Sequence, residues 1–532
     1  MADTLRLALA SRLPTAQSPP GLLGSVAVTI LTLLVVYVIK FAPRDDKIIP
    51  SYEVVGMSKR DTFSEAQKRY STSSRAILQE GLTRIRNAFQ VYTPVGPVIV
   101  LPKRYTEEIK NHKQLSFAKN VEKSTFGTLP ATSLMPGMAG FMFGAHRLEV
   151  MAGTARMQLT QSLGKITARL SEETAMAIDE YFPSNKGDWN NIVFYPTAVR
   201  LVSRLSALVF LGDEICRNEE WLHVSGQYAI DGIDFIRALR SWPAILQPIA
   251  QFFLPERRKI CKHEKMARKI IQPVVDKRKR EAMEDAKAGR PPKEYTDALQ
   301  WLQDAMDKSG RKFDIVGGQL GLGLASIHTT SMALTRAIFD LCDNPEWVQP
   351  LRDEVKQVLA EDGGWKKTTL HKMKLMDSVL KESQRRNPVH FTIMTRIAEA
   401  DVDLSGGVHV RKGDMITVTT TETMMDPAVF PEPERFIGDR FLKLRQIPGN
   451  ENKWQYVTTS ADHIGFGHGA HACPGRFFAG NELKIVLAHM LMKYDWAFAP
   501  GHDSRNIELA QDIIPNPVAE LMFKERNKDN GS

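Results

Sequence analysis

The residues with the clearest capacity for chemistry lie near the C-terminus, around Cys473. Three glycines precede this cysteine, Gly465, Gly467 and Gly469, and they allow the backbone to fold closely against something flat or bulky. Pro474 follows directly and suits the first turn of a helix. At a helix N-terminus, unpaired N–H groups and the dipole lower the pKa of a thiol. A thiolate in a glycine-lined loop is what an axial ligand of heme iron requires.

Three histidines close to this cysteine raise zinc as a competing metal. His463, His468, His471 and Cys473 fall within eleven residues, in the spacing H-x4-H-x2-H-x-C. This spacing lacks the paired ligands of closed structural zinc sites, and the intervening glycines would hold the ligands poorly. A buried cysteine that binds no metal is the other alternative, because most free cysteines are of that kind. The spacing therefore argues against zinc, and the buried free cysteine stays open as an alternative.

The segment also resembles a known signature. Phe466-x-x-Gly469-x-x-x-Cys473-x-Gly475 resembles the heme-binding motif of the cytochrome P-450 superfamily of heme-thiolate monooxygenases, and His-Ala-Cys-Pro-Gly-Arg-Phe-Phe-Ala is similar to its filamentous-fungal members. The resemblance implies that Cys473 is the proximal ligand of heme b and that Phe466, Gly469 and Gly475 surround the cofactor. His471 stands where many members carry an arginine that faces a heme propionate, and a histidine can donate a hydrogen bond there.

An acid and a base stand one helical turn apart about 90 residues before the cysteine. Glu382 and Arg385 have an i, i+3 spacing that usually gives only a weak surface salt bridge. In the family, a Glu-x-x-Arg pair at this position joins an arginine of a Phe-x-x-x-Arg-Phe stretch. Arg440 lies in such a stretch, while a Pro-Glu-Arg-Phe segment just before it matches a family motif one step early. The resemblance implies a buried structural network of Glu382, Arg385 and Arg440 behind the heme.

A third motif lies within a long apolar run, where Ser-Ile-His328-Thr329-Thr-Ser occurs. Hydroxyl side chains inside a helix usually bond back to the preceding turn and have no further role. The segment resembles the family's oxygen-activation motif, in which a small residue, an acid and a threonine lie over the distal face of the heme. His328 replaces the acid and Thr329 keeps its place. The resemblance implies that both are proton-delivery candidates, because histidine relays protons near neutral pH.

Four basic residues complete the candidate site. Arg156 and Arg396 resemble the family's propionate-binding arginines, although a solvent-facing arginine is an alternative for each. Arg476 and Lys484 lie near the cysteine segment and are candidates for meeting an acidic reductase surface. The resemblance thus implies heme b as the cofactor, held in part by cationic side chains. NADPH takes part only indirectly, through a reductase.

Composition limits the class of protein that must position these residues. The 532-residue chain has 43% hydrophobic and 25% charged residues, close to globular averages, which excludes collagen-like, wholly disordered and multi-span membrane proteins. Its net charge of +9 does not identify a partner by itself. Four dispersed cysteines without a CxxC pair exclude a disulfide framework and a zinc ribbon, and they indicate a reducing compartment.

The N-terminal region contains one candidate membrane span. Residues 22–39 carry no charge over 18 positions, and at 1.5 Å per residue they reach about 27 Å, close to the ~30 Å of a bilayer core. A cleaved signal peptide is the alternative, but the run is longer than a typical apolar region of such a peptide and no cleavage pattern follows it. Five basic residues soon after the span against two before it place the C-terminal body on the cytoplasmic side.

The elements behind the site are mainly helical. Residues 89–101 predict two strands around a Pro-Val-Gly-Pro turn, and residues 402–420 predict another hairpin with Gly406-Gly407 at its turn. Apolar periodicity predicts helices over residues 153–179, 198–210, 315–342 and 376–386. The fold class predicted is therefore mainly α (α+β): a helical heme domain with small β-sheets on a single N-terminal transmembrane helix.

Two further segments have alternative interpretations. Phe235 to Leu254 mixes aromatic residues and prolines with few charges, so it is either buried core or an exposed apolar loop that dips into the bilayer. Lys277 to Lys293 alternates basic and acidic residues, which favours a solvated helix end and loop over a nucleic-acid-binding patch.

Together these features predict five regions: a short tail (1–21), a transmembrane anchor (22–39), a linker (40–51), a heme-thiolate monooxygenase domain (52–524) and a polar tail (525–532). The resemblance implies insertion of one oxygen atom from O2 into a lipophilic, terpenoid-like substrate of fungal secondary metabolism. Its implied partners are an NADPH-cytochrome P-450 reductase and the endoplasmic reticulum membrane, with no nucleic acid. An O2-independent heme-thiolate isomerase or dehydratase, and a non-enzymatic heme- or lipid-binding membrane protein, are the alternatives.

Overall fold

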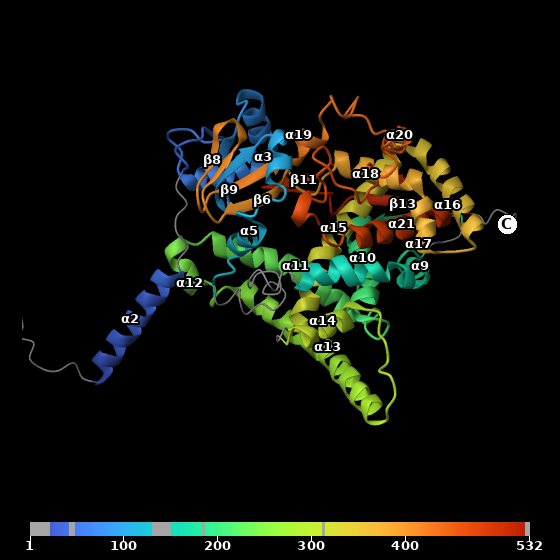
Figure 1. Ribbon diagram of the computed structural model, residues 1–532, viewed down its shortest axis with the longest axis horizontal. Helices are drawn as coiled ribbons and strands as arrows, with labels where there is room; N and C mark the ends of the chain where they lie inside the picture. The colour runs from blue at the N-terminus through green and yellow to red at the C-terminus, as the bar shows by residue number, and fades with distance from the viewer. Residues whose placement is uncertain (1–21, 42–47, 130–149, 184–186, 311–313, 527–532) are drawn as a thin grey trace, which may run out of the picture.

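The computed structural model describes residues 22–41, 48–129, 150–183, 187–310 and 314–526. The predicted tail (1–21), half of the predicted linker and most of the polar tail lie outside the described residues. Within the described residues the protein is mainly helical. The six-stranded sheet lies at one side of the molecule, whereas β13 (Glu520–Glu525) lies among the helices toward the other side (Figure 1).

The helices follow one another along most of the chain. The main ones are α2 (Leu22–Phe41), α3 (Phe63–Arg84), α5 (Phe117–Ser124), α9 (Thr160–Tyr181), α10 (Phe194–Leu211), α11 (Glu219–Arg240), α13 (Pro255–Lys287), α14 (Ala298–Ser309), α15 (Ile315–Asp343), α16 (Val348–Asp362), α18 (Lys374–Arg386) and α21 (Arg476–Lys493). Shorter helices are α4 (Thr106–Ile109), α12 (Gln247–Ala250), α17 (Lys367–Lys372), α19 (Thr420–Met424) and α20 (Arg440–Gln446).

Four small sheets accompany the helices. The largest has the strand order β1-β2-β3-β9-β6-β4 and contains β1 (Val54–Val55), β2 (Phe89–Thr93), β3 (Gly96–Leu101), β9 (Met415–Thr419), β6 (Thr392–Ala398) and β4 (Leu115–Ser116). A second sheet joins β10 (Tyr494–Phe498), β13 (Glu520–Glu525) and β5 (Asn190–Val193). The two remaining pairs are β7 (Val402–Leu404) with β8 (Val408–Val410), and β11 (Ile507–Leu509) with β12 (Asp512–Ile514).

Most sequence-based elements are confirmed. The antiparallel pair β2–β3 forms the predicted hairpin, and α9, α10, α15 and α18 occur close to the predicted bounds. The second hairpin is confirmed only for β7 and β8, because Met415–Thr419 pairs with β6 and β3 instead. Alternating apolar residues predict that a segment is a strand, but the choice of its partner strand depends on tertiary packing.

The interior is built around α10 and α15, which pack against each other. Among the described residues, Phe194–Leu211 stands out as long and apolar enough to cross a membrane, but 72% of it is buried, so we assign it to the core. The same apolar cluster extends to α9, α18 and α21, which places the helix after Cys473 in the centre of the molecule.

The segment from Phe235 to Leu254 divides between the two interpretations. Phe235 and Leu239 belong to the buried face of α11. The residues that follow expose large apolar side chains: Trp242, Ile245, Leu246, Phe252 and Phe253. These exposed side chains flank the largely buried α12, which contacts α2, and Figure 1 shows α2 leading away from the body at this point.

Candidate active site

The loop before Cys473 is folded tightly by two glycines with left-handed backbone. Gly467 and Gly469 have φ values of +69° and +80°. A Cβ on Gly469 would lie 2.4 Å from the carbonyl oxygen of Lys110, so no side chain fits there. The amide of Cys473 donates to the carbonyl of Phe466 at 2.8 Å and closes the loop. These constraints fix the position of the thiol three residues before α21 begins.

The environment of the thiol differs from the one that the sequence predicts. Burial raises the pKa of Cys473, while the backbone amides of Gly475 and Arg476 and the Arg476 guanidinium lower it. The helix-start donors that we expected are present, but the desolvation that accompanies burial outweighs them. The predicted net lowering of the pKa is therefore wrong for the protein alone.

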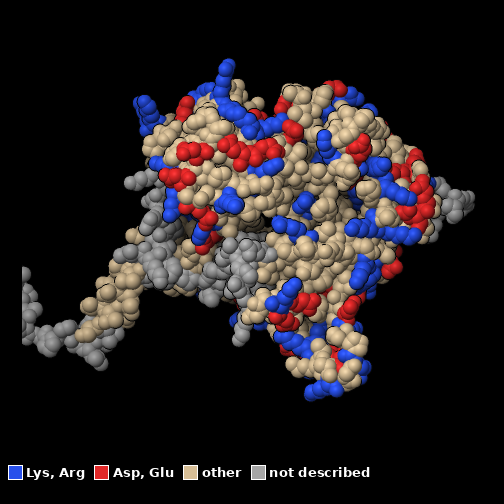
Figure 2. Space-filling model, in the orientation of Figure 1, with Lys and Arg blue, Asp and Glu red and all other residues tan. Residues whose placement is uncertain are grey.

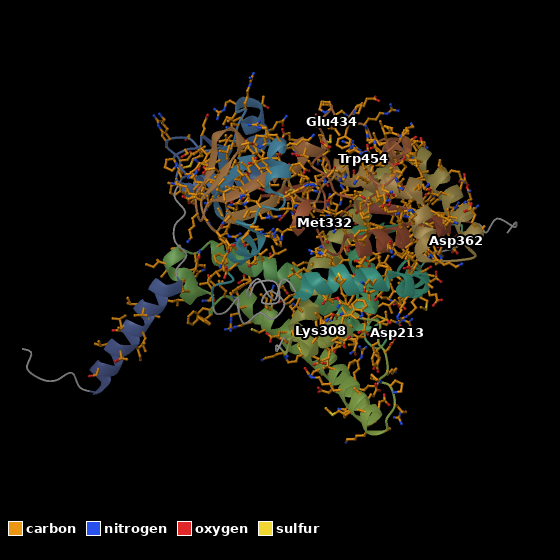
Figure 3. The ribbon with its side chains drawn as sticks, viewed as in Figure 1. Asp213, Lys308, Met332, Asp362, Glu434 and Trp454 are labelled. Atoms are coloured by element: carbon orange, nitrogen blue, oxygen red, sulfur yellow. The ribbon has the colours of Figure 1, made fainter. Side chains whose placement is uncertain are left out.

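A cavity of about 1080 Å³ opens over this loop. Cys473, Phe466 and Gly475 contribute to one part of its wall, and Thr329 of α15 contributes to another. Most of the remaining lining is apolar, and it includes Leu322, Ala325, Met332, Ala333, Val389, Ile393, Met394, Ile513 and Pro515. Figure 3 places Met332 near the middle of the molecule. A thiol, a helix hydroxyl and a large apolar space thus meet in the protein interior.

Three cationic or imidazole groups gather at the same cavity. Arg156, Arg396 and His471 all line it. Burial is the main cause that lowers the pKa of His471, and the positive charges of the two arginines lower it further. Burial lowers the pKa of Arg396 to about 10. Its Nη1 donates only to the carbonyl of Thr395, and neither arginine forms an ion pair within the described part of the chain. Two charges without carboxylate partners fit an anionic group that the cavity would hold.

His328 lies on the side of α15 that faces away from this cavity. Its Nε2 is 2.8 Å from the carbonyl oxygen of Gly226 in α11, and its Nδ1 is 3.1 Å from the hydroxyl of Tyr195 in α10. Because the carbonyl can only accept, Nε2 carries the proton and Nδ1 accepts from Tyr195. Burial lowers the pKa of His328, which favours this neutral form. His328 therefore joins three helices, and the structure does not bring it to the cavity wall.

Thr329 takes the opposite orientation. Its hydroxyl donates to the carbonyl of Ala325 at 2.9 Å, and the residue lines the cavity. Ser326, one turn earlier, also lines the cavity, and its hydroxyl has no hydrogen-bond partner among the described residues. Sequence reasoning missed Ser326, although its i, i+3 spacing from Thr329 places both on one helix face.

The structure brings Glu382, Arg385 and Arg440 together in the core. Arg385 holds the carboxylate through two nitrogens, at 2.8 and 2.9 Å, and Nε of Arg440 lies 3.1 Å from each oxygen. The arginines also donate to backbone carbonyls, Arg385 to Pro433 and Arg440 to Pro431. Each charge is thus compensated, as buried ions require.

The histidines of the zinc alternative point apart. His463 is buried and lies 3.3 Å from the carbonyl of Lys381, while His468 contacts Thr459 and Glu107. No group of three metal-binding side chains occurs in the described part of the chain.

Sequence reasoning also missed Lys381, a wholly buried lysine whose pKa burial lowers to about 7.

The prediction that Lys484 meets an acidic reductase surface is wrong. Lys484 is buried, and its ammonium pairs with Asp377 at 2.5 Å and donates to the carbonyl of Leu370. A periodic sequence pattern does not show that a lysine will compensate a buried carboxylate. Arg476 is half-buried and donates to the carbonyls of Val457 and Cys473, so its contact with a partner stays a prediction.

A helical fold that holds a single thiol against a large apolar cavity, with uncompensated cations at the wall, defines a heme-thiolate protein. The chain belongs to the cytochrome P450 family, which it matches over residues 93–523. It is 38% identical over 474 residues to the cytochrome P450 monooxygenase adrA of Penicillium rubens, covering 88% of this chain and 90% of the relative. It is also 38% identical over 468 residues to the cytochrome P450 monooxygenase hepE of Aspergillus oryzae, covering 88% and 84%.

The fold agrees with a solved structure of this family. Retinoic-acid-bound cyanobacterial CYP120A1 superimposes with a TM-score of 0.60 at 18% identity, covering 84% of this chain and 94% of that one. The predicted family, cytochrome P450 fold and enzyme class are confirmed: the protein is a monooxygenase that incorporates oxygen by means of heme-thiolate iron. The N-terminal transmembrane helix of the predicted fold class stays a prediction. The heme supplies oxygen activation when bound. Cys473 would ligate its iron, and Arg156, Arg396 and His471 would hold its carboxylates.

Proposed function

We propose that the protein is a membrane-anchored monooxygenase of fungal secondary metabolism that oxidises a lipophilic, terpenoid-like substrate, with electrons from NADPH through a cytochrome P450 reductase. The observation that carries this proposal is that Cys473 and Thr329 share one large, mainly apolar cavity. Apolar walls favour a hydrocarbon skeleton, and a space of this size accommodates a drug-sized or larger molecule. The match to fungal monooxygenases supports the metabolic setting.

The proposed role of Thr329 is to position a proton donor in the cavity, with Ser326 as a second hydroxyl on the same face. His328 has a different proposed role. Because both of its nitrogens are engaged with α10 and α11, it positions α15 and does not itself carry protons to the cavity. For Glu382, Arg385 and Arg440 the proposed role is the one that the family resemblance implies, which is to support the fold behind the heme.

The proposed anchor is α2. Its described side chains from Val28 to Val36 are all exposed, and the hydroxyls of Thr29 and Thr32 bond back to the carbonyls four residues earlier. Such self-satisfied hydroxyls suit a lipid environment, which offers no water. Figure 2 shows the described part of α2 free of charged side chains. The exposed apolar residues around α12 lie beside it and would enter the same bilayer.

The test is the absorption spectrum of the reduced, CO-bound protein, with the Cys473→Ala variant beside it. We expect a thiolate-type Soret band in the native protein and its loss in the variant. A native protein without that band would refute the heme-thiolate assignment. Turnover of fed terpenoids that continues without NADPH, reductase or O2 would instead support an isomerase or dehydratase.

The anchor has its own test. We expect the full-length protein to sediment with microsomal membranes and to resist extraction by high salt. Removal of residues 1–41 should weaken this association, and Trp242, Phe252 and Phe253 changed to serine should weaken what remains. Recovery of the full-length protein in the soluble fraction would contradict the proposed anchor.

A further inference from the structure

The cavity wall includes an arginine apart from the two assigned to the heme. Arg336 lies on α15 seven residues after Thr329, and both residues line the cavity. Seven residues make about two helical turns, so the two side chains leave the same helix face roughly 10 Å apart along its axis.

The guanidinium of Arg336 is only partly engaged. Its Nη1 donates to the carbonyl of Ser504 at 3.0 Å. Its Nε is enclosed and has no hydrogen-bond partner, and its Nη2 makes no hydrogen bond within the described ranges. Burial lowers the pKa of Arg336, but a guanidinium keeps its charge in proteins. Because Nε is enclosed, Nη2 is the donor that a ligand in the cavity could reach, and it lacks an acceptor among the described residues.

Asp340, one turn further along α15, offsets this charge only in part, through space and without an ion pair. Asp340 accepts from the hydroxyl of Ser383 at 2.6 Å and from the amide of Asn387 at 3.2 Å, and Arg386 lies 3.9 Å away. Arg336 forms no ion pair with it or with any other residue that the structure describes. Asp340 is thus satisfied by other groups, and it leaves Arg336 as the charge that faces the cavity.

The surrounding wall is polar on one side and apolar on the other. Asn506 donates to the side-chain oxygen of Asn387 at 3.3 Å, while its own oxygen has no partner among the described residues. Gln511 and His390 also line this region, and His390 contacts Asp512 at 2.9 Å. The apolar lining described above begins directly beside this polar group. Such a wall matches an amphipathic ligand with a polar group at one end.

The heme carboxylates have their own partners elsewhere. The positive charges of Arg156 and Arg396 both lower the pKa of His471, which places these three side chains close together. The charges that shift the pKa of Arg336 belong to Asp340, Asp343 and Arg386, none of which contributes to the pKa shift of His471. Arg336 is therefore separate from the groups placed to hold the heme.

We propose that Arg336 forms an anion-binding subsite and that the substrate carries a carboxylate at one end of an apolar skeleton. The Nη2 donors of a charged guanidinium form charge-assisted hydrogen bonds to a carboxylate oxygen. One arginine close to Asp340 favours a monoanion over a phosphate. The proposal rests on the monooxygenase function proposed above and defines the chemical class of its substrate. The carbon oxidised next to Thr329 then lies about 10 Å from the carboxylate along α15.

The test compares acids with their uncharged counterparts on the heme-loaded, full-length protein. Abietic acid, methyl abietate and abietinol form one set; dodecanoic acid, its methyl ester and dodecanol form another. Binding is followed by the change in the Soret band of the ferric protein. We expect the acid of at least one set to bind about ten- to a hundredfold more tightly than its ester, as a charge-assisted hydrogen bond in an enclosed site would give.

Variants locate the effect. Arg336→Gln should abolish the preference for the acid, and Arg336→Lys should keep part of it because it keeps the charge but not the fork. Arg435→Gln, at an exposed arginine far from the cavity lining, is the matched control and should leave the preference unchanged. Equal binding of acid and ester in both sets by the native protein, or a preference that survives Arg336→Gln, would overturn the proposal.

The two proposals fail differently. A native protein without the thiolate-type Soret band in its reduced, CO-bound form refutes the monooxygenase proposal and makes the ligand comparison irrelevant to it. A protein with that band and no preference for acids refutes the subsite alone. If Arg336→Gln does not retain heme, Arg336→Lys decides, because the displaced charge and the loss of the planar Nη2 donor must still weaken the preference.

Discussion

The core network gives the sharpest test of how the site is supported, through the substitution Arg440→Met. Methionine keeps an unbranched apolar stem but removes the charge and the donors. Glu382 is fully buried and Arg440 almost so, so water cannot replace the lost bonds. The carboxylate keeps Arg385 and the amide of Ile437, whereas the carbonyls of Pro431 and Glu432 lose the donors that Arg440 gave them.

The expected cost follows from this inventory. Breaking a buried ion pair by removing one partner costs about 3–5 kcal/mol, mainly because the remaining charge is uncompensated. Glu382 here retains one bidentate arginine, so we expect the lower end, about 3 kcal/mol. The surface pair of Arg435 and Glu432, 3.5 Å apart and with the arginine 70% exposed, provides the comparison. Arg435→Met should cost less than about 0.5 kcal/mol.

The assay is urea unfolding of the heme-loaded protein, followed by the Soret band and by helical circular dichroism. A double-mutant cycle with Glu382→Gln separates the pairwise term from the cost of each change. If Arg440→Met shifts the apparent free energy of unfolding by no more than Arg435→Met does, the three residues do not form the buried, compensated network described here.

Three further predictions concern single residues. His328→Leu should destabilise the protein by about 1–3 kcal/mol through the lost bonds of the buried imidazole. Burial lowers the pKa of His328, so its contribution to the free energy of unfolding is complete above about pH 6.5 and is lost as the pH falls. The difference in stability between the native protein and the variant should therefore narrow from pH 7.5 to pH 5. A difference that widens would contradict the assignment of a neutral imidazole. Gly469→Ala should lower heme content, since a Cβ meets the Lys110 carbonyl at 2.4 Å, whereas Gly164→Ala, at an exposed position of α9 with open space and outside the cavity lining, should leave heme content unchanged; equal heme loading of the two would refute this. Burial raises the pKa of Glu482 to about 8, so native stability falls as pH rises from about 4.5 to 8, and Glu482→Gln should flatten that fall in unfolding experiments; an unchanged slope would count against a buried, neutral acid.

The sequence alone determined those features that depend on neighbours along the chain. Three glycines and a cysteine before a helix define the ligand loop because its backbone is constrained locally. Glu382 and Arg385 share a helix face because their spacing is one turn. Apolar periodicity gave α9, α10, α15 and α18 for the same reason. The match to a family motif added Arg440, whose distance along the chain carries no local signal.

Only the tertiary structure decided what stands opposite each side chain. His328 and Thr329 are adjacent on one helix, yet one bonds to α10 and α11 while the other lines the cavity, because neighbouring positions on a helix point about 100° apart. Lys484 compensates a buried carboxylate, and Arg336 forms no ion pair with one among the described residues, although both are single basic residues within apolar helices. Burial, which outweighs the helix-start donors at Cys473, likewise depends on elements distant in sequence. The sequence therefore defines which chemistry is possible, and long-range packing defines which side chains take part in it.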